Sequence, residues 1–198
     1  MRMADGGVAG LVLAAGAGRR MGGPKALLRL TPSGPSLVET AVTRLHDAGV
    51  GDVHVVVGSA AEQVTQRVER AGGIVVAATD WAEGMGASLR RGLEALTDTG
   101  ADAALLMLVD LPDVVAEVHA RLLEAADDEG ELTAALVRAA YDGLPGHPVL
   151  LGRAHWAAVR ESAVGDSGAR DYFRAQRPRL VECSDLATGR DIDRPADV

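Results

Sequence analysis

Cysteine occurs once in the 198 residues, at Cys183, so no disulfide can form within the chain. A lone thiol is typical of a protein in a reducing compartment. No stretch approaches the ~20 consecutive apolar residues that a membrane-spanning helix needs, and no charged-then-apolar signal segment opens the chain. These absences lead us to expect a cytoplasmic protein without a membrane partner.

Aromatic residues make up only 3% of the chain, so its core has to be built from alanine, valine and leucine. Basic residues are outnumbered by acidic ones, 20 to 28, and the net charge of −8 argues against a nucleic-acid partner. Lysine is scarcer still, because Lys25 is the only one and every other basic residue is arginine. This asymmetry indicates a position that requires a compact, flexible ammonium group instead of a planar guanidinium.

Short apolar runs alternate with longer segments of helical periodicity along the whole chain. The expected strands are 8–13, 53–57, 74–78, 103–109, 132–137, 149–151 and 180–183. The expected helices are 35–49, 61–71, 87–96, 114–127, 155–161 and 169–176, with surface loops at 31–35 and 142–148. This alternation predicts a three-layer α/β/α fold, Rossmann-like and with a mostly parallel sheet, in one domain over residues 1–198.

A glycine-rich, basic loop follows the first expected strand and ends at Lys25. Gly16 and Gly18 let the backbone approach a ligand closely, and successive N–H groups can form an anion-binding concavity. The dinucleotide fingerprint fails here, because Met21 stands where its third glycine belongs. The mononucleotide P-loop also fails, because Ala26 follows Lys25 where serine or threonine is required. The loop therefore predicts a phosphate site of another kind.

Residues 13–25, Leu-Ala-Ala-Gly-Ala-Gly-Arg-Arg-Met-Gly-Gly-Pro-Lys, resemble the signature of the MobA-like NTP transferases, which are sugar-nucleotidyltransferase-like enzymes. Within that family the chain is most similar to the molybdenum cofactor cytidylyltransferases. The resemblance implies one nucleotidyltransferase domain that transfers CMP from CTP to a phosphate of a molybdopterin-type cofactor and releases pyrophosphate. It implies Arg20 and Lys25 as catalytic residues, with Arg19 a flanking charge, and nucleotide contacts from Leu13, Ala14, Ala15, Gly16 and Gly18.

Asp110 stands at the end of the longest apolar run, followed by Leu111 and Pro112. Open α/β sheets bind ligands at the carboxyl ends of their strands, and a carboxylate there can hold Mg²⁺. The alternative is that Asp110 caps a helix beginning near Pro112. The family resemblance implies the metal role, because its Asp-x-Pro acid binds the cation.

Two more carboxylates, Asp191 and Asp193, are spaced so that on an extended segment they face the same side. Residues 191–198 resemble the family ending Asp-Ile-Asp-Thr-Pro-Glu-Asp-Leu, which implies a second metal ligand, although Arg194 and Ala196 depart from it. Solvated charges are the alternative. Which of the two acids reaches the metal stays open, and we favour Asp193.

Three further segments carry family resemblance. The segment 84–93 implies nucleotide contacts at Gly84 and Ser88, although by itself it is only a loop entering a helix. The segments 143–150 and 165–170 resemble the cytidylyltransferase sequences Gly-His-Pro-Val and Gly-Asp-x-Gly-Ala-Arg, which implies acceptor contacts at His147, Gly168 and Arg170. Residues 165–168, Gly-Asp-Ser-Gly, do not indicate a serine protease, because no supporting His/Asp constellation accompanies them.

Other functions remain open at this stage. A guanylyltransferase of the same cofactor and a cytidylyltransferase of an isoprenoid intermediate would use the same glycine loop. A different class is a non-catalytic maturation factor that binds the cofactor and delivers it to a client molybdoenzyme. The presence of Arg20, Lys25 and Asp110 together argues for retained catalysis.

Overall fold

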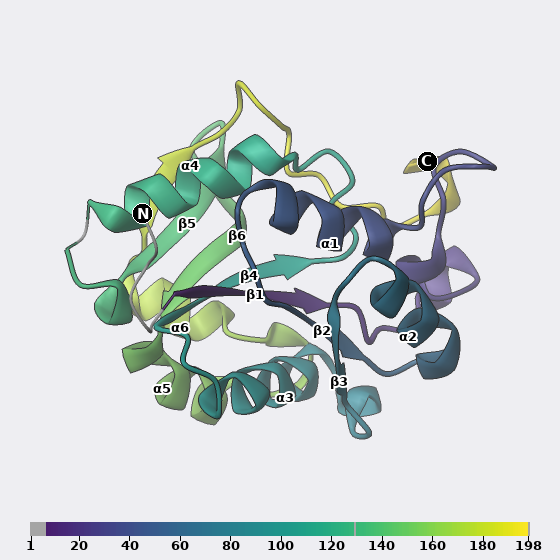
Figure 1. The fold of residues 1–198 in the computed structure, drawn as a ribbon, viewed down its shortest axis with the longest axis horizontal. Helices are drawn as coiled ribbons and strands as arrows, with labels where there is room; N and C mark the ends of the chain where they lie inside the picture. Colours follow the sequence, from purple (N-terminus) through teal and green to yellow (C-terminus); the bar gives the residue numbers. More distant parts are fainter. Residues whose placement is uncertain (1–6, 129, 198) are drawn as a thin grey trace.

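The computed structural model describes residues 7–128 and 130–197, which alternate strands and helices in chain order (Figure 1). The strands are β1 (Val8–Leu13), β2 (Val53–Val57), β3 (Ile74–Ala77), β4 (Ala103–Leu108), β5 (Leu136–Tyr141), β6 (Leu144–Gly152) and β7 (Arg179–Glu182). The helices are α1 (Leu37–Asp47), α2 (Ala61–Arg70), α3 (Met85–Thr97), α4 (Ala116–Asp127), α5 (Trp156–Ser162) and α6 (Arg170–Gln176).

The strands form one seven-stranded sheet in the order β3-β2-β1-β4-β6-β5-β7. β1 pairs in parallel with both β2 and β4, whereas β6 runs antiparallel to its neighbours β4 and β5. The central strands β1 and β4 are almost continuously buried, as expected of parallel strands covered on both faces. Their carboxyl ends, at Leu13 and Leu108, lie side by side in register.

Helices cover both faces of the sheet, which makes the three layers (Figure 1). One core cluster packs α1, α2 and α4 against the sheet, and a second packs α3, α5 and α6 against the other face. Alanine, valine and leucine dominate both clusters, as the low aromatic content requires. α3 lies especially close to the sheet, because a Cβ at Gly92 would stand 2.6 Å from Leu11 Cδ1. The predicted three-layer fold with a mostly parallel sheet is confirmed.

Three local expectations are wrong. The stretch 132–137 is not a strand throughout, because residues 132–134 form a 3₁₀ turn and β5 begins at Leu136. The expected loop 142–148 belongs mostly to β6, which forms a hairpin with β5. Asp142 and Gly143 make its two-residue turn, both with positive φ (52° and 75°), the conformation that a tight hairpin turn requires. The helix expected from residue 114 begins at Ala116 instead.

None of the helices in the described part of the chain is long and apolar enough to cross a membrane.

Candidate nucleotide and metal site

A cavity of about 390 Å³ opens at the carboxyl ends of β1 and β4. Residues 13–19 form one wall and the segment from Trp81 to Ser88 forms another, with Lys25 and Asp110 between them. Every nucleotide contact predicted from the sequence lines this cavity: Leu13, Ala14, Ala15, Gly16, Gly18, Gly84 and Ser88. The structure therefore brings together two segments that lie far apart in the chain.

The glycine loop is folded tightly on itself. Gly18 has a φ of +57°, and its carbonyl accepts hydrogen bonds from the backbone N–H groups of Met21 (2.8 Å) and Gly23 (3.2 Å). A Cβ at Gly18 would overlap the Gly23 carbonyl oxygen, 1.9 Å away, so only glycine fits this turn. Across the cavity Gly84 is similarly constrained, because its φ is +117° and a Cβ there would stand 2.7 Å from Asp166 Oδ1.

Lys25 joins two carboxylates at the centre of the site. Its Nζ donates hydrogen bonds to Asp110 Oδ2 (2.8 Å) and to Asp193 Oδ1 (2.6 Å). The side chains of Lys25 and Asp110 are largely buried, with 17% and 18% of their surface exposed, whereas Asp193 is 43% exposed. Arg20 reaches the same group from solvent, with its Nη1 3.3 Å from Asp193 Oδ2. The chain's single lysine thus occupies a position where a compact ammonium can contact two carboxylates at once.

The charges in this group stabilise one another. Burial alone would lower the pKa of Lys25, but its hydrogen bonds and charge interactions with Asp110 and Asp193 outweigh burial, and its pKa lies above the ordinary value. The hydrogen bond and charge of Lys25 hold the pKa of Asp193 below its usual range. At neutral pH the lysine is therefore protonated and Asp193 ionised.

The carboxylates also fit a divalent cation. Asp110, Asp191 and Asp193 each offer an oxygen, and the three oxygens lie within 4.8 Å of one another. Asp110 Oδ1 is buried and has no hydrogen-bond partner among the described residues, which is costly for a carboxylate oxygen unless a cation or donor meets it. Mg²⁺ and Mn²⁺ prefer such oxygen ligands. The helix-capping alternative for Asp110 is wrong, because α4 starts at Ala116 with Val115 at its N-cap.

Asp193 is brought to the site by residues 188–194, which form neither helix nor strand and which we call the C-terminal strap. The Asp113 carboxylate accepts hydrogen bonds from the Thr188 backbone N–H (2.6 Å) and hydroxyl, and the Ile192 N–H donates to the Asp110 carbonyl (3.0 Å). Gly189 has a φ of +64° and lies against Tyr141, whose ring a Cβ would overlap at 2.2 Å. These contacts hold the strap across the end of β4.

The predicted acceptor residues lie beside the cavity and not in its lining. His147 is on β6, and Tyr141 donates a hydrogen bond to its carbonyl (2.8 Å). Burial, and then the positive charge of Arg138, lower the pKa of His147 to about 3, so its imidazole is neutral at neutral pH. Gly168 is buried against Met85, and Arg170 is exposed at the start of α6.

Several lining residues were missed by sequence reasoning. Arg19, interpreted as a flanking charge, lines the cavity, whereas Arg20 does not. Asp166 also lines it, and its place inside the segment 165–170 was the signal that could have found it. Trp81 lines the opposite wall, three residues before the expected nucleotide segment. Nothing in the local sequence pattern indicated where its ring would lie.

A family model described as the MobA-like NTP transferase domain matches residues 10–180. This chain belongs to the MobA-like NTP transferase family. The match covers every strand from β2 to β6 and both walls of the cavity, so it confirms the family resemblance found in the glycine loop. Membership in this family makes the chain a nucleotidyltransferase by class.

Similar proteins carry different names. The chain is 37% identical over 197 residues to a protein named nicotine blue oxidoreductase from Paenarthrobacter nicotinovorans, across 94% of this chain and 92% of that protein. A crystal structure from Mycobacterium sp. strain JC1, described as a homologue of Mycobacterium tuberculosis Rv0371c, is 29% identical, with a TM-score of 0.80 over 96% of this chain and 92% of that one. A manganese complex of Rv0371c from M. tuberculosis H37Rv is 26% identical, with a TM-score of 0.68 over 91% and 88%.

Proposed function

We propose that the protein transfers CMP from CTP to a phosphate of a molybdopterin-type cofactor, with Mg²⁺, in a single nucleotidyltransferase domain. The observation that carries the proposal is the Lys25 ammonium held between Asp110 and Asp193 beside the glycine loop. In the reaction an oxygen of the acceptor phosphate attacks the α-phosphorus of the nucleotide. A new P–O bond forms as the bond from the α-phosphorus to the leaving pyrophosphate oxygen breaks.

The chain's residues would act by positioning and by neutralising charge, which dominate phosphoryl transfer. Backbone N–H groups around Gly16 and Gly18 bind phosphate oxygens. Lys25 and Arg20 stabilise the negative charge that develops on the α-phosphate and the leaving pyrophosphate. Asp110 and Asp193 would hold the divalent cation, which would supply positive charge to stabilise the negative charge of the reacting phosphates. The manganese complex of the similar Rv0371c supports a divalent cation in this fold.

The acceptor would lie over β6 and α6, where His147, Gly168 and Arg170 are the proposed contacts. Arg138 on β5 is a second cation in this area. Two contacts hold its side chain in place: its Nε donates to the Gly146 carbonyl (2.7 Å), and its guanidinium lies 5.5 Å from the Phe173 ring centre. A positively charged area beside the cavity suits an acceptor that carries a phosphate. CTP and the molybdopterin-type acceptor themselves rest on the sequence resemblance to cytidylyltransferases.

The name of one relative, nicotine blue oxidoreductase, favours a second candidate, an oxidoreductase, for which we propose a nicotinamide nucleotide in the same cavity as the hydride donor. The two candidates differ in what they need. Nucleotidyl transfer uses the Lys25, Asp110 and Asp193 group together with a divalent cation, whereas hydride transfer from a nicotinamide ring requires neither.

The deciding experiment measures two products on the same purified protein. Pyrophosphate release is followed with CTP, GTP, ATP or UTP, each with Mg²⁺ and purified molybdopterin cofactor, and oxidation of NADH or NADPH is followed with quinone acceptors. We expect pyrophosphate release that requires cofactor and cation and is fastest with CTP. Faster release with GTP than with CTP would make the protein a guanylyltransferase of the same cofactor. No release with any nucleotide would overturn the proposal, and NAD(P)H oxidation would then support the reductase.

A further inference from the structure

Trp81 is the one aromatic side chain among the residues that line the cavity. Its indole N–H has no hydrogen-bond partner among the described residues, and it is not buried away from solvent. The chain's other tryptophan, Trp156, is different: it is 3% exposed, its Nε1 donates to the Leu151 carbonyl (2.9 Å), and Arg153 covers its ring at 4.9 Å. Trp156 is thus a core residue, whereas Trp81 is only partly buried: it packs against the core and also lines the cavity, where a ligand can contact it.

The position of Trp81 is tightly fixed. Its backbone lies in a 3₁₀ turn, in which the Trp81 N–H donates to Ala78 (3.3 Å) and the Trp81 carbonyl accepts from Gly84 (3.1 Å). Gly58, just after β2, leaves room for the side chain, because a Cβ there would stand 2.5 Å from Trp81 Cγ and 2.6 Å from its Cβ. These are the inner atoms of the tryptophan, so any larger residue at position 58 would displace the whole ring.

The two ends of the cavity differ in chemistry. Asp110 follows β4, and Gly58 with Trp81 lies beside the end of β2. β1 and its glycine loop lie between them, because the sheet order is β2-β1-β4. Strands are spaced by about 4.8 Å, so the charged end and the aromatic end are separated by roughly two strand widths. A ligand that uses both ends has phosphates at one and an apolar, planar group at the other.

We infer that Trp81 stacks on the base of the bound nucleotide and that Gly58 positions it to do so. This inference rests on the proposed function only in taking the ligand to be a nucleotide. Every nucleobase has a π-face, so Trp81 supplies affinity for a planar heterocycle. Selection between bases falls to polar groups such as the Ser88 hydroxyl, which lines the same wall and has no partner among the described residues.

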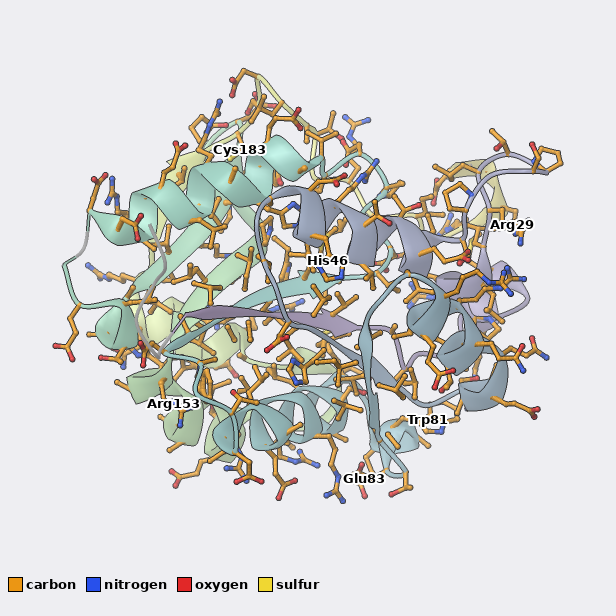
Figure 2. All side chains as sticks on the ribbon, viewed as in Figure 1. Arg29, His46, Trp81, Glu83, Arg153 and Cys183 are labelled. Carbon is orange, nitrogen blue, oxygen red and sulfur yellow. The ribbon has the colours of Figure 1, made fainter. Side chains whose placement is uncertain are left out.

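Trp81 and Trp156 lie near opposite ends of α3. Figure 2 labels Trp81, and it labels Arg153, whose guanidinium covers the ring of Trp156. Tryptophan fluorescence can therefore report on each ring separately. The Trp156→Phe variant reports on Trp81 alone, and Trp81→Phe reports on Trp156 alone. We expect CTP and the nucleoside cytidine to change the fluorescence of Trp156→Phe, and tripolyphosphate to leave it unchanged. Trp81→Phe should respond to none of the three. A change with tripolyphosphate equal to that with CTP would contradict stacking.

Affinity provides the second test, measured by calorimetry with Mg²⁺. Loss of base–aromatic stacking should weaken CTP binding by about 5- to 150-fold in Trp81→Ala. Trp81→Phe should lose much less, and Gly58→Ala, which keeps the ring but displaces it, should resemble Trp81→Ala. Tripolyphosphate should bind all of these variants as it binds the unaltered protein, which also shows that they are folded.

The outcomes distinguish this inference from the proposed function. If base-dependent binding requires Trp81 but no pyrophosphate is released with any acceptor, the stacking role stands and nucleotidyl transfer fails. If NADPH, and not CTP, changes the Trp81 signal, the ring contacts a base of another nucleotide and the reductase is favoured. If Trp81→Ala and Gly58→Ala bind CTP and NADPH as tightly as the unaltered protein, the inference is overturned.

Discussion

Lys25 and Asp193 are 168 residues apart in the chain, yet the lysine Nζ lies 2.6 Å from the aspartate Oδ1. The contact joins the glycine loop after β1 to the C-terminal strap, and Asp110 at the end of β4 completes the group. Three distant segments therefore meet at one edge of the sheet, and each of them can be tested separately.

Replacing Lys25 should reduce catalysis without unfolding the protein. Lys25→Ala removes a cation from the charge developing in the transition state, and we expect the turnover number to fall about 10²- to 10³-fold. Lys25→Arg should not restore it, because the guanidinium is larger and planar and cannot occupy the largely buried position of the compact ammonium without displacing its neighbours. Arg29→Ala, an exposed neighbour, is the matched control. Turnover is measured by pyrophosphate release, and circular dichroism shows whether each variant is folded. Near-normal turnover in Lys25→Ala would show that Lys25 is not a catalytic residue.

The three carboxylates should differ in their effect on the cation. Asp110→Asn and Asp193→Asn should each raise the Mg²⁺ concentration needed for half-maximal activity by at least tenfold, because each removes a charged oxygen ligand. Asp191→Asn should change it less, because Asp191 is exposed and makes no contact with Lys25. Manganese binding followed by electron paramagnetic resonance measures the same affinity without turnover. Equal effects of all three variants would place Asp191 among the ligands.

Displacing the C-terminal strap should impair the site without altering any charged residue. Gly189→Ala forces a Cβ into the Tyr141 ring, so the strap and Asp193 must shift. Because small misplacements of positioning groups are costly, we expect turnover to fall about 10- to 100-fold. Gly130→Ala is the control, since Gly130 has the same kind of positive φ (87°) but open space around its Cβ position. If both variants have equal turnover, the strap does not depend on this contact.

Acid should destabilise the fold through His119, which is fully buried on the inner face of α4. Burial, and secondarily the charge of Arg44, lower its pKa from an ordinary 6.5 to about 4. Between these values the unfolded chain binds a proton that the native state does not, so the free energy of unfolding falls as the pH drops. The loss should reach at most about 2.5 kcal/mol between about pH 6.5 and about pH 4.5.

Urea denaturation of the unaltered protein and of His119→Leu at both pH values measures this contribution. The variant should lose less stability on acidification than the unaltered protein. His54 and His147, whose pKa values are also lowered chiefly by burial, contribute to the remaining acid sensitivity in both proteins, as do carboxylates with lowered pKa values such as Asp193 and Glu182. An identical pH dependence in the two would show that His119 does not titrate in this range.

The sequence predicted features that depend on local pattern. The apolar runs of β1 and β4, and the glycines and lysine that follow β1, are signals contained in short segments, and the fold class and family followed from them. The β5–β6 hairpin was missed although Asp142-Gly143 is a strong turn signal, because Pro145, Gly146 and Pro148 make the start of β6 resemble a loop.

Features that depend on long-range packing could not be predicted from the residues alone. The position of Trp81 depends on the clearance at Gly58 in another loop, and that of Asp193 on anchors at Asp113 and Tyr141. The local sequence around Trp81 or Asp193 has no pattern that indicates which distant residues it will contact. Residue spacing and family resemblance indicated Asp193 as a metal ligand and favoured it over Asp191, but neither predicted its contact with Lys25.

The long chain separation between Lys25 and Asp193 also has a consequence for folding. Contacts between distant residues form only after the entropy cost of closing the intervening chain has been met by other interactions. The sheet and both helical layers must therefore be assembled before the C-terminal strap can reach the glycine loop. We expect a refolding chain to regain its helical circular dichroism first and its ability to bind nucleotide and cation last.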